Sequence, residues 1–128
     1  MDVIYTVTTE KSLEDAVNDV KEKLAEVKFG VLWEFDIPAT LEKKGVNFEG
    51  KAKVLEVCNP HKAKEALESN MSVVHFLPCK VVVYEDEKKT KIGMLKPTVF
   101  MELMQDEWLE GFARSVEENI RKALDMAV

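Results

Sequence analysis

The hydrophobic positions first follow a strand period and then a helical one. Residues 4–9 combine near alternation with β-branched and aromatic side chains, which predicts a strand. Ser12 and Asp15 resemble a capping box, and apolar residues then recur every three or four positions to about Lys28. Gly30 suits the left-handed position just past the helix end. The predicted helix buries one face, formed by Leu13, Ala16, Val17, Val20, Leu24 and Val27.

A period of two follows, which predicts a half-buried strand that begins at Val31. Residues 52–58 form the next predicted strand, and a hairpin is the simplest connection between the two. The first of these strands would present one face with Val31, Trp33, Phe35 and Ile37, and another with Leu32, Glu34 and Asp36.

The second half of the chain predicts a short helix, two strands and a long helix. Asn59-Pro60 is a typical helix start, with a capping amide before a proline in the first turn. Residues 73–84 are the strongest β segment, and Pro78 within it implies a bulge or an edge because proline cannot donate to a ladder. Residues 91–95 return as a shorter strand. One amphipathic helix is then predicted from Pro97 to the C-terminus, carrying Phe100, Leu103, Met104, Phe112, Val116, Ile120 and Leu124.

These elements occur in the order β-α-β-β-α-β-β-α. Because the strand pairs are joined by hairpins, the order predicts an α+β fold with an antiparallel sheet of about five strands and helices packed on one face. A chain of 128 residues suits one core, so we expect a single domain over residues 1–128.

Charge and hydropathy narrow the classes of function. A formal net charge of -6 argues against nucleic-acid binding, which depends on Lys and Arg displacing counterions. No segment approaches the roughly 20 apolar residues of a membrane helix, and the first residues lack the pattern of a signal peptide. We therefore expect a cytoplasmic protein with no nucleic-acid or membrane partner.

Two cysteine segments differ from an ordinary core. Cys58-Asn59-Pro60-His61 and Leu77-Pro78-Cys79 each place a cysteine where a strand ends or bends. Cys58, His61 and Cys79 could converge on a metal ion with an open fourth position. His75 could not join them, because on an extended strand it lies about 13 Å from Cys79. Buried inert thiols and a solvated His61 remain the alternative.

Cys58 also precedes a predicted helix start. Peptide dipoles there favour an anion and would lower the pKa of its thiol, as a redox pair with Cys79 or an anionic ligand would require. Glu56 could line the helix-free side of the sheet together with Glu34 and Asp36, although a solvated face explains these acids equally well.

Trp108 interrupts the polar side of the last predicted helix. With Met101 and Met104 it could form an apolar patch, and such patches often mark a dimer contact.

The motifs together resemble a known family. Residues 54–60, which end in Cys-Asn-Pro, the short helix with Ala63, Ala66 and Leu67, and residues 77–85, which begin Leu-Pro-Cys, are similar to the family called domain of unknown function 302. The segment 69–76 departs from the Gly-containing stretch more usual there. The resemblance implies a TATA-binding-protein-like α+β sandwich and frequent homodimers, without an established biochemical role.

No phosphate-binding loop, nucleophile elbow or dinucleotide fingerprint is present in the sequence. The first hypothesis is therefore non-enzymatic binding or sensing of a small ligand or metal, with Cys58, Asn59, His61, Cys79 and Glu56 as candidate site residues and the cofactor unknown. The alternatives are a protein-interaction module that forms a homodimer and a thiol redox protein that uses Cys58 and Cys79.

Overall fold

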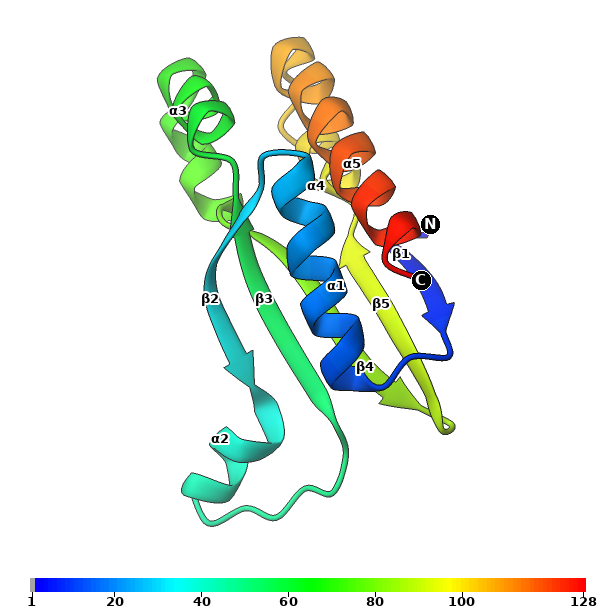
Figure 1. Ribbon diagram of the computed structural model, residues 1–128. Coiled ribbons are helices and arrows are strands. Elements are labelled where there is room, and N and C mark those ends of the chain that lie inside the picture. Colours follow the sequence, from blue (N-terminus) through cyan, green and yellow to red (C-terminus); the bar gives the residue numbers. More distant parts are fainter. Residues whose placement is uncertain (1) are drawn as a thin grey trace.

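The computed structural model describes residues 2–128 as an antiparallel sheet with helices, which confirms the α+β fold class. The strands are β1 (Ile4–Thr9), β2 (Gly30–Asp36), β3 (Ala52–Cys58), β4 (Cys79–Asp86) and β5 (Lys89–Leu95). They lie in the order β1-β5-β4-β3-β2, and every neighbouring pair is antiparallel (Figure 1). The chain therefore crosses from one edge of the sheet to the other between β1 and β2.

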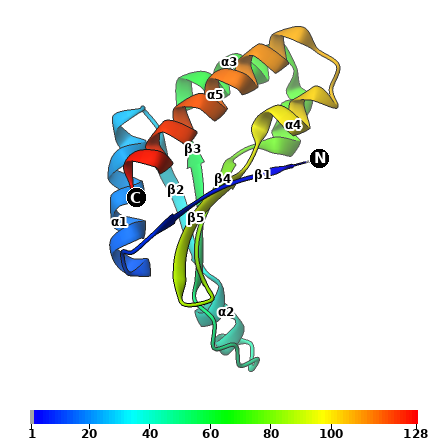
Figure 2. The same ribbon diagram turned by 90° about the vertical axis from the view of Figure 1, so that its right-hand side faces the viewer.

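The helices are α1 (Leu13–Glu26), α2 (Ile37–Lys43), α3 (Pro60–Ser69), α4 (Pro97–Glu102) and α5 (Glu107–Met126), with a 3₁₀ helix, η1 (Met71–Phe76), after α3. Seen edge-on in Figure 2, α1 lies on one side of the sheet, whereas α4 lies on the other side beyond the end of β5. No helix among residues 2–128 combines the length and apolar character needed to cross a membrane.

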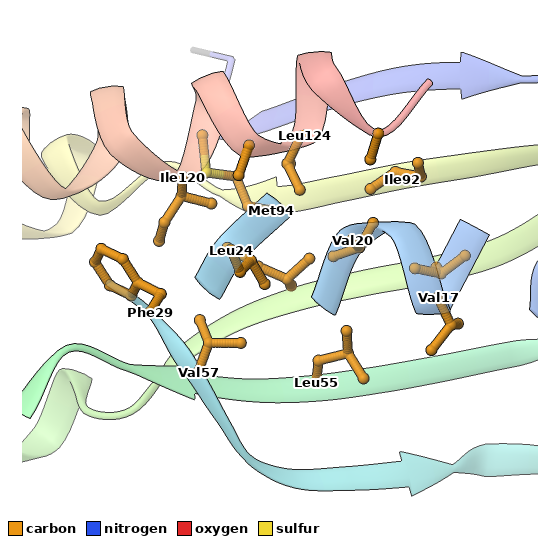
Figure 3. Packing of buried hydrophobic residues seen from close by; sticks show 14 of the residues in the cluster. Val17, Val20, Leu24, Phe29, Leu55, Val57, Ile92, Met94, Ile120 and Leu124 are labelled. Atoms are coloured by element: carbon orange, nitrogen blue, oxygen red, sulfur yellow. The ribbon is translucent and has the colours of Figure 1, made fainter. Parts of the chain in front are cut away.

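The main core fills the space between the sheet and the helices α1 and α5. Leu24 of α1, Leu55 of β3, Ile92 of β5 and Leu124 of α5 are at most 1% exposed (Figure 3). The predicted apolar face of α1 is confirmed, since its buried residues are Ala16, Val17, Val20 and Leu24. A second, smaller cluster joins α3, η1, α4 and α5 through Ala66, Val73, Met101, Leu109 and Ala113.

The end of α1 differs from the prediction. Lys28, with a φ of 70°, occupies the left-handed position, and Gly30 is already the first residue of β2. The amide of Phe29 donates to the carbonyl of Leu24, which is the bond that closes a Schellman motif. Phe29 is thereby placed in the core, where it is 3% exposed.

A β-bulge at Leu32 overturns the predicted faces of β2. The ladder pairs Val31 with Val57 but Trp33 with Glu56, so the register shifts by one residue between them. Val31 packs against the main core, whereas Trp33 lies with Glu56 on the face away from α1. The prediction that Val31 and Trp33 share a face is therefore wrong.

The same register separates Glu34 from Glu56. Glu34 is opposite the buried Leu55, and its carboxylate contacts Lys21 of α1 and accepts a hydrogen bond of 3.0 Å from Lys53. Lys21, which has the larger effect, and Lys53 hold the pKa of Glu34 below its usual range. The expectation that Glu34 and Glu56 line one face together is wrong.

Two segments break where the sequence predicted continuity. Residues 73–76, predicted as the start of a strand, belong to η1, and β4 starts only at Cys79, after Pro78. The predicted C-terminal helix divides into α4 and α5 at Gln105, which has a φ of 52°. Asp106 caps α5 by accepting hydrogen bonds from the amides of Trp108 and Leu109, and Leu103 is left 74% exposed.

The connection between β2 and β3 holds α2 instead of a tight hairpin. The side chain of Asp36 accepts a hydrogen bond of 3.0 Å from the amide of Ala39, and Pro38 occupies the first turn. The sequence carried this start signal, a capping residue followed by proline, at the end of a strand. The pairing of β2 with β3 itself agrees with the prediction.

Candidate functional site

The two cysteines lie on neighbouring strands but point to opposite faces of the sheet. Cys79 is opposite Val57, and both side chains pack on the side of the main core. Cys58 follows Val57 in β3, so the pleat turns it to the other face. Both are free thiols.

The electrostatic surroundings do not activate either thiol. Burial raises the pKa of Cys58, which contradicts the lowering expected from the start of α3. Burial, followed by the charges of Cys58 and Glu56, raises the pKa of Cys79 to about 11. A redox or nucleophilic cysteine needs a lowered pKa, so these directions argue against the thiol redox hypothesis.

The predicted metal ligands do not assemble. Within residues 2–128, no group of three His, Cys, Asp or Glu side chains is arranged to hold a metal ion. His61 is exposed in the first turn of α3. The arrangement of the described residues therefore gives no support to the predicted metal set of Cys58, His61 and Cys79.

Asn59 has a structural partner. Its side-chain oxygen accepts a hydrogen bond of 3.1 Å from the amide of Lys62 and so caps α3, as the sequence predicted. It is 9% exposed.

A cavity of about 750 Å³ opens at the end of the sheet where β4 begins and β5 ends. Its floor is a row of side chains across four strands, its walls come from the segment between η1 and β4, and α4 and α5 close the remaining side. The lining residues are Leu32, Trp33, Glu56, His75, Phe76, Leu77, Pro78, Cys79, Lys80, Leu95, Pro97, Phe100, Met101, Phe112, Ala113 and Val116.

The cavity contains two of the five predicted site residues, Cys79 and Glu56. Cys58, Asn59 and His61 are not part of its lining. Sequence reasoning did not include His75, because it was placed on a strand. The sequence feature that could have indicated this wall is the apolar run Phe76-Leu77-Pro78, because the proline interrupts a regular strand there.

His75 has a defined tautomer. Its Nδ1 lies 2.9 Å from the carbonyl oxygen of Ser72, and because a carbonyl only accepts, Nδ1 carries the proton. In the neutral ring, Nε2 is then left as a hydrogen-bond acceptor.

Aromatic rings make up much of the cavity wall. Phe76 and Phe100 lie with ring centroids 6.3 Å apart, and Phe112 stacks on Trp108 at 5.4 Å. The ammonium group of Lys62 lies 5.9 Å from the Phe112 ring and donates a hydrogen bond of 2.9 Å to Ser115, which joins α3 to α5 behind this wall.

Comparison with known proteins identifies the family. The model of "Domain of unknown function DUF302" matches residues 5–127. The chain belongs to this family. It is similar to the crystal structure of an uncharacterized conserved protein DUF302 from Bacillus stearothermophilus, with 38% sequence identity, a TM-score of 0.96 and complete coverage of both chains. The search of curated proteins found no match. The family resemblance inferred from the Cys-Asn-Pro and Leu-Pro-Cys motifs is confirmed.

The raised pKa of Cys79 predicts slow reaction with alkylating reagents. At pH 8 a thiol with a pKa of about 11 holds about one hundredth of the thiolate of a thiol with a pKa of 9.0. In a Cys58→Ser variant, which removes the second cause but leaves burial, the largest one, native Cys79 should still react with iodoacetamide more slowly than in guanidinium chloride, and its rate should still rise with pH above 9.

In the matched Cys79→Ser variant, the same assay measures the alkylation rate of Cys58. A native Cys79 rate that reaches its plateau below pH 8 would contradict the described environment of this thiol.

Proposed function

We propose that this domain binds a small, largely apolar molecule in the cavity at the end of the sheet. The observation that carries the proposal is the combination of a volume of about 750 Å³ with walls that are mainly apolar and aromatic. Ligand sites typically enclose about 300–1,000 Å³ and combine such walls with a few polar groups. Cys79, His75, Glu56 and Lys80 supply the polar groups here.

The exposure of the floor supports binding by this cavity. Trp33 is 57% exposed, and Leu32 and Leu95 are 64% and 41% exposed. Large exposed apolar groups that line a cavity are typical of surfaces that a ligand or partner covers. A ligand on this floor would remove part of that apolar area from water.

The protonation state of Cys79 favours binding without catalysis. Cys79 stays protonated near neutral pH, since its pKa is raised to about 11, and a thiol is a poor nucleophile in that form. Its role in the cavity is that of a small polarizable wall group.

Filling the cavity should remove binding. Leu95 lies on the floor, whereas Ile4, opposite it in β1, is on the same face but outside the lining. We expect native protein to bind 3-methylindole in isothermal titration with a negative heat-capacity change. Leu95→Trp should weaken this binding at least tenfold, and Ile4→Trp should not.

Circular dichroism of both variants checks that each remains folded. Absence of binding to native protein, or equal loss in the two variants, would contradict the proposal.

A homodimer is the second candidate function, and the face of the sheet away from α1 favours it. Trp33 stacks on Phe35 with ring centroids 5.2 Å apart, and the ladder continues the row of Phe35 through Val54, Val82, Gly93 and Thr6. This uncharged middle row lies outside the cavity. Nearer the turn between β4 and β5, Lys91 and Asp86 form an ion pair of 3.4 Å.

A second copy of the chain suits this face. Although each chain carries a net charge of -6, the middle row has no charge of its own and the ion pair beside it is neutral as a unit. Two copies could therefore bring the rows together through a two-fold axis without placing like charges in contact.

The patch predicted around Trp108 is only partly present. Trp108 is 47% exposed, but Met101 is 5% exposed and belongs to the second core cluster. Leu103, which the sequence placed on the buried face, is exposed. Trp108 is therefore the control position for a substitution on the face of the sheet away from α1.

A charge in the middle row should dissociate the dimer. Phe35→Asp would place an unpaired charge in the apolar contact between the two copies. Sedimentation velocity should show native protein as a dimer, Phe35→Asp as a monomer and Trp108→Asp still as a dimer.

Monomeric native protein would contradict the second candidate function altogether. A monomer from Trp108→Asp together with a dimer from Phe35→Asp would place the contact on α5 instead.

A further inference from the structure

The floor of the cavity contains one anion and one cation in a single row. The ladders place Trp33 opposite Glu56 and Glu56 opposite Lys80. Because Val81 is opposite Met94, the next position along the two strands brings Lys80 beside Leu95 of β5. Residues directly opposite each other point to the same face of a sheet. All four line the cavity, so two charged side chains lie between two apolar ones on its floor.

Glu56 and Lys80 are opposite in register but do not form an ion pair with each other. Among the ion pairs and side-chain hydrogen bonds within residues 2–128, neither residue takes part. By contrast, Glu34 on the other face engages two lysines. The carboxylate and the ammonium group on the floor are therefore both open to a ligand.

Glu56 lines the cavity together with Cys79. Glu56 is half-buried, and its negative charge contributes to the raised pKa of Cys79, another lining residue. At a half-buried position such as that of Glu56, electrostatic interactions are stronger than at a fully exposed one.

These two charges select among ligand head groups. A ligand with only a carboxylate would meet Lys80 but also the like charge of Glu56, and a ligand with only an ammonium group would have the converse problem. A head group that carries both charges can engage both side chains, and each charge-assisted hydrogen bond is stronger than a neutral one.

We infer that the cavity binds molecules with a zwitterionic head group, an ammonium beside a carboxylate, attached to an apolar body. The ammonium lies at Glu56 and the carboxylate at Lys80, while the body lies among Trp33, Phe76 and Phe100. The aromatic walls favour a flat ring as that body. This inference rests on the proposed binding function and adds the class of ligand.

A series of indoles that differ only in charge tests the inference by isothermal titration at pH 7. Tryptophan carries both charges, tryptamine the positive one, indole-3-propionate the negative one and 3-methylindole neither. Native protein should bind tryptophan about tenfold more tightly than each of the other three, which corresponds to about 1.4 kcal/mol. 2-Aminodecanoic acid carries the same head group on an aliphatic body, and its affinity relative to that of tryptophan shows whether the cavity prefers a ring or a chain.

Charge-removing variants assign each end of the head group. Glu56→Gln should weaken tryptophan and tryptamine at least fivefold without weakening indole-3-propionate, and Lys80→Met should weaken tryptophan and indole-3-propionate without weakening tryptamine. Lys91→Met, on the same face but outside the cavity, is the matched control and should leave the whole series unchanged.

Equal affinity for all four indoles, or an equal effect of Glu56→Gln and Lys80→Met on every ligand, would overturn the zwitterion inference. In both cases binding of 3-methylindole would still support the proposed function. If 3-methylindole does not bind, the proposed function fails, and the inference that rests on it fails with it.

Discussion

The register between β3 and β4 is the constraint on which the rest of this structure depends. It pairs Leu55 with Val81 and sends both under α1 and α5, and the pleat then necessarily turns Glu56 and Lys80 to the opposite face. A slip of one residue would expose the apolar set and bury the charged pair, so burial of the core enforces the register. The same alternation separates Cys58 from Cys79, and it thereby removes the cysteine pair as a single site.

The sequence was most informative where one periodicity ran without interruption. The α1 face and the antiparallel order of the strands followed from spacing and capping residues, because burial on one face imposes that spacing. The pattern failed in β2, where the bulge at Leu32 shifts the register and no residue type marks it. Strand and helix propensities also could not show that η1 or the break at Gln105 would occur, since both depend on tertiary packing around Val73 and Leu109.

The candidate site arises from those same irregular segments. Because β4 starts only after Pro78, the preceding residues are free to turn as η1 and contribute His75 and Phe76 to a wall. Because the last helix breaks before Asp106, α4 can fold against the end of β5 while α5 continues over the main core. A continuous strand and a continuous helix, as the sequence suggested, would not have enclosed this cavity. Two of the five predicted site residues, Cys79 and Glu56, line this cavity, whereas Asn59 of the Cys-Asn-Pro motif caps α3.

The central claim is that a ligand occupies the end of the sheet between η1, α4 and α5. Chemical-shift mapping of backbone amides in ¹⁵N-labelled protein during titration with 3-methylindole measures this location directly. The account predicts saturable shifts concentrated at residues 75–80 and around Phe100 and Ala113, with the opposite end of the sheet near Glu34 unchanged. Shifts centred on Cys58 and His61, or on Glu34 and Lys53, would contradict it.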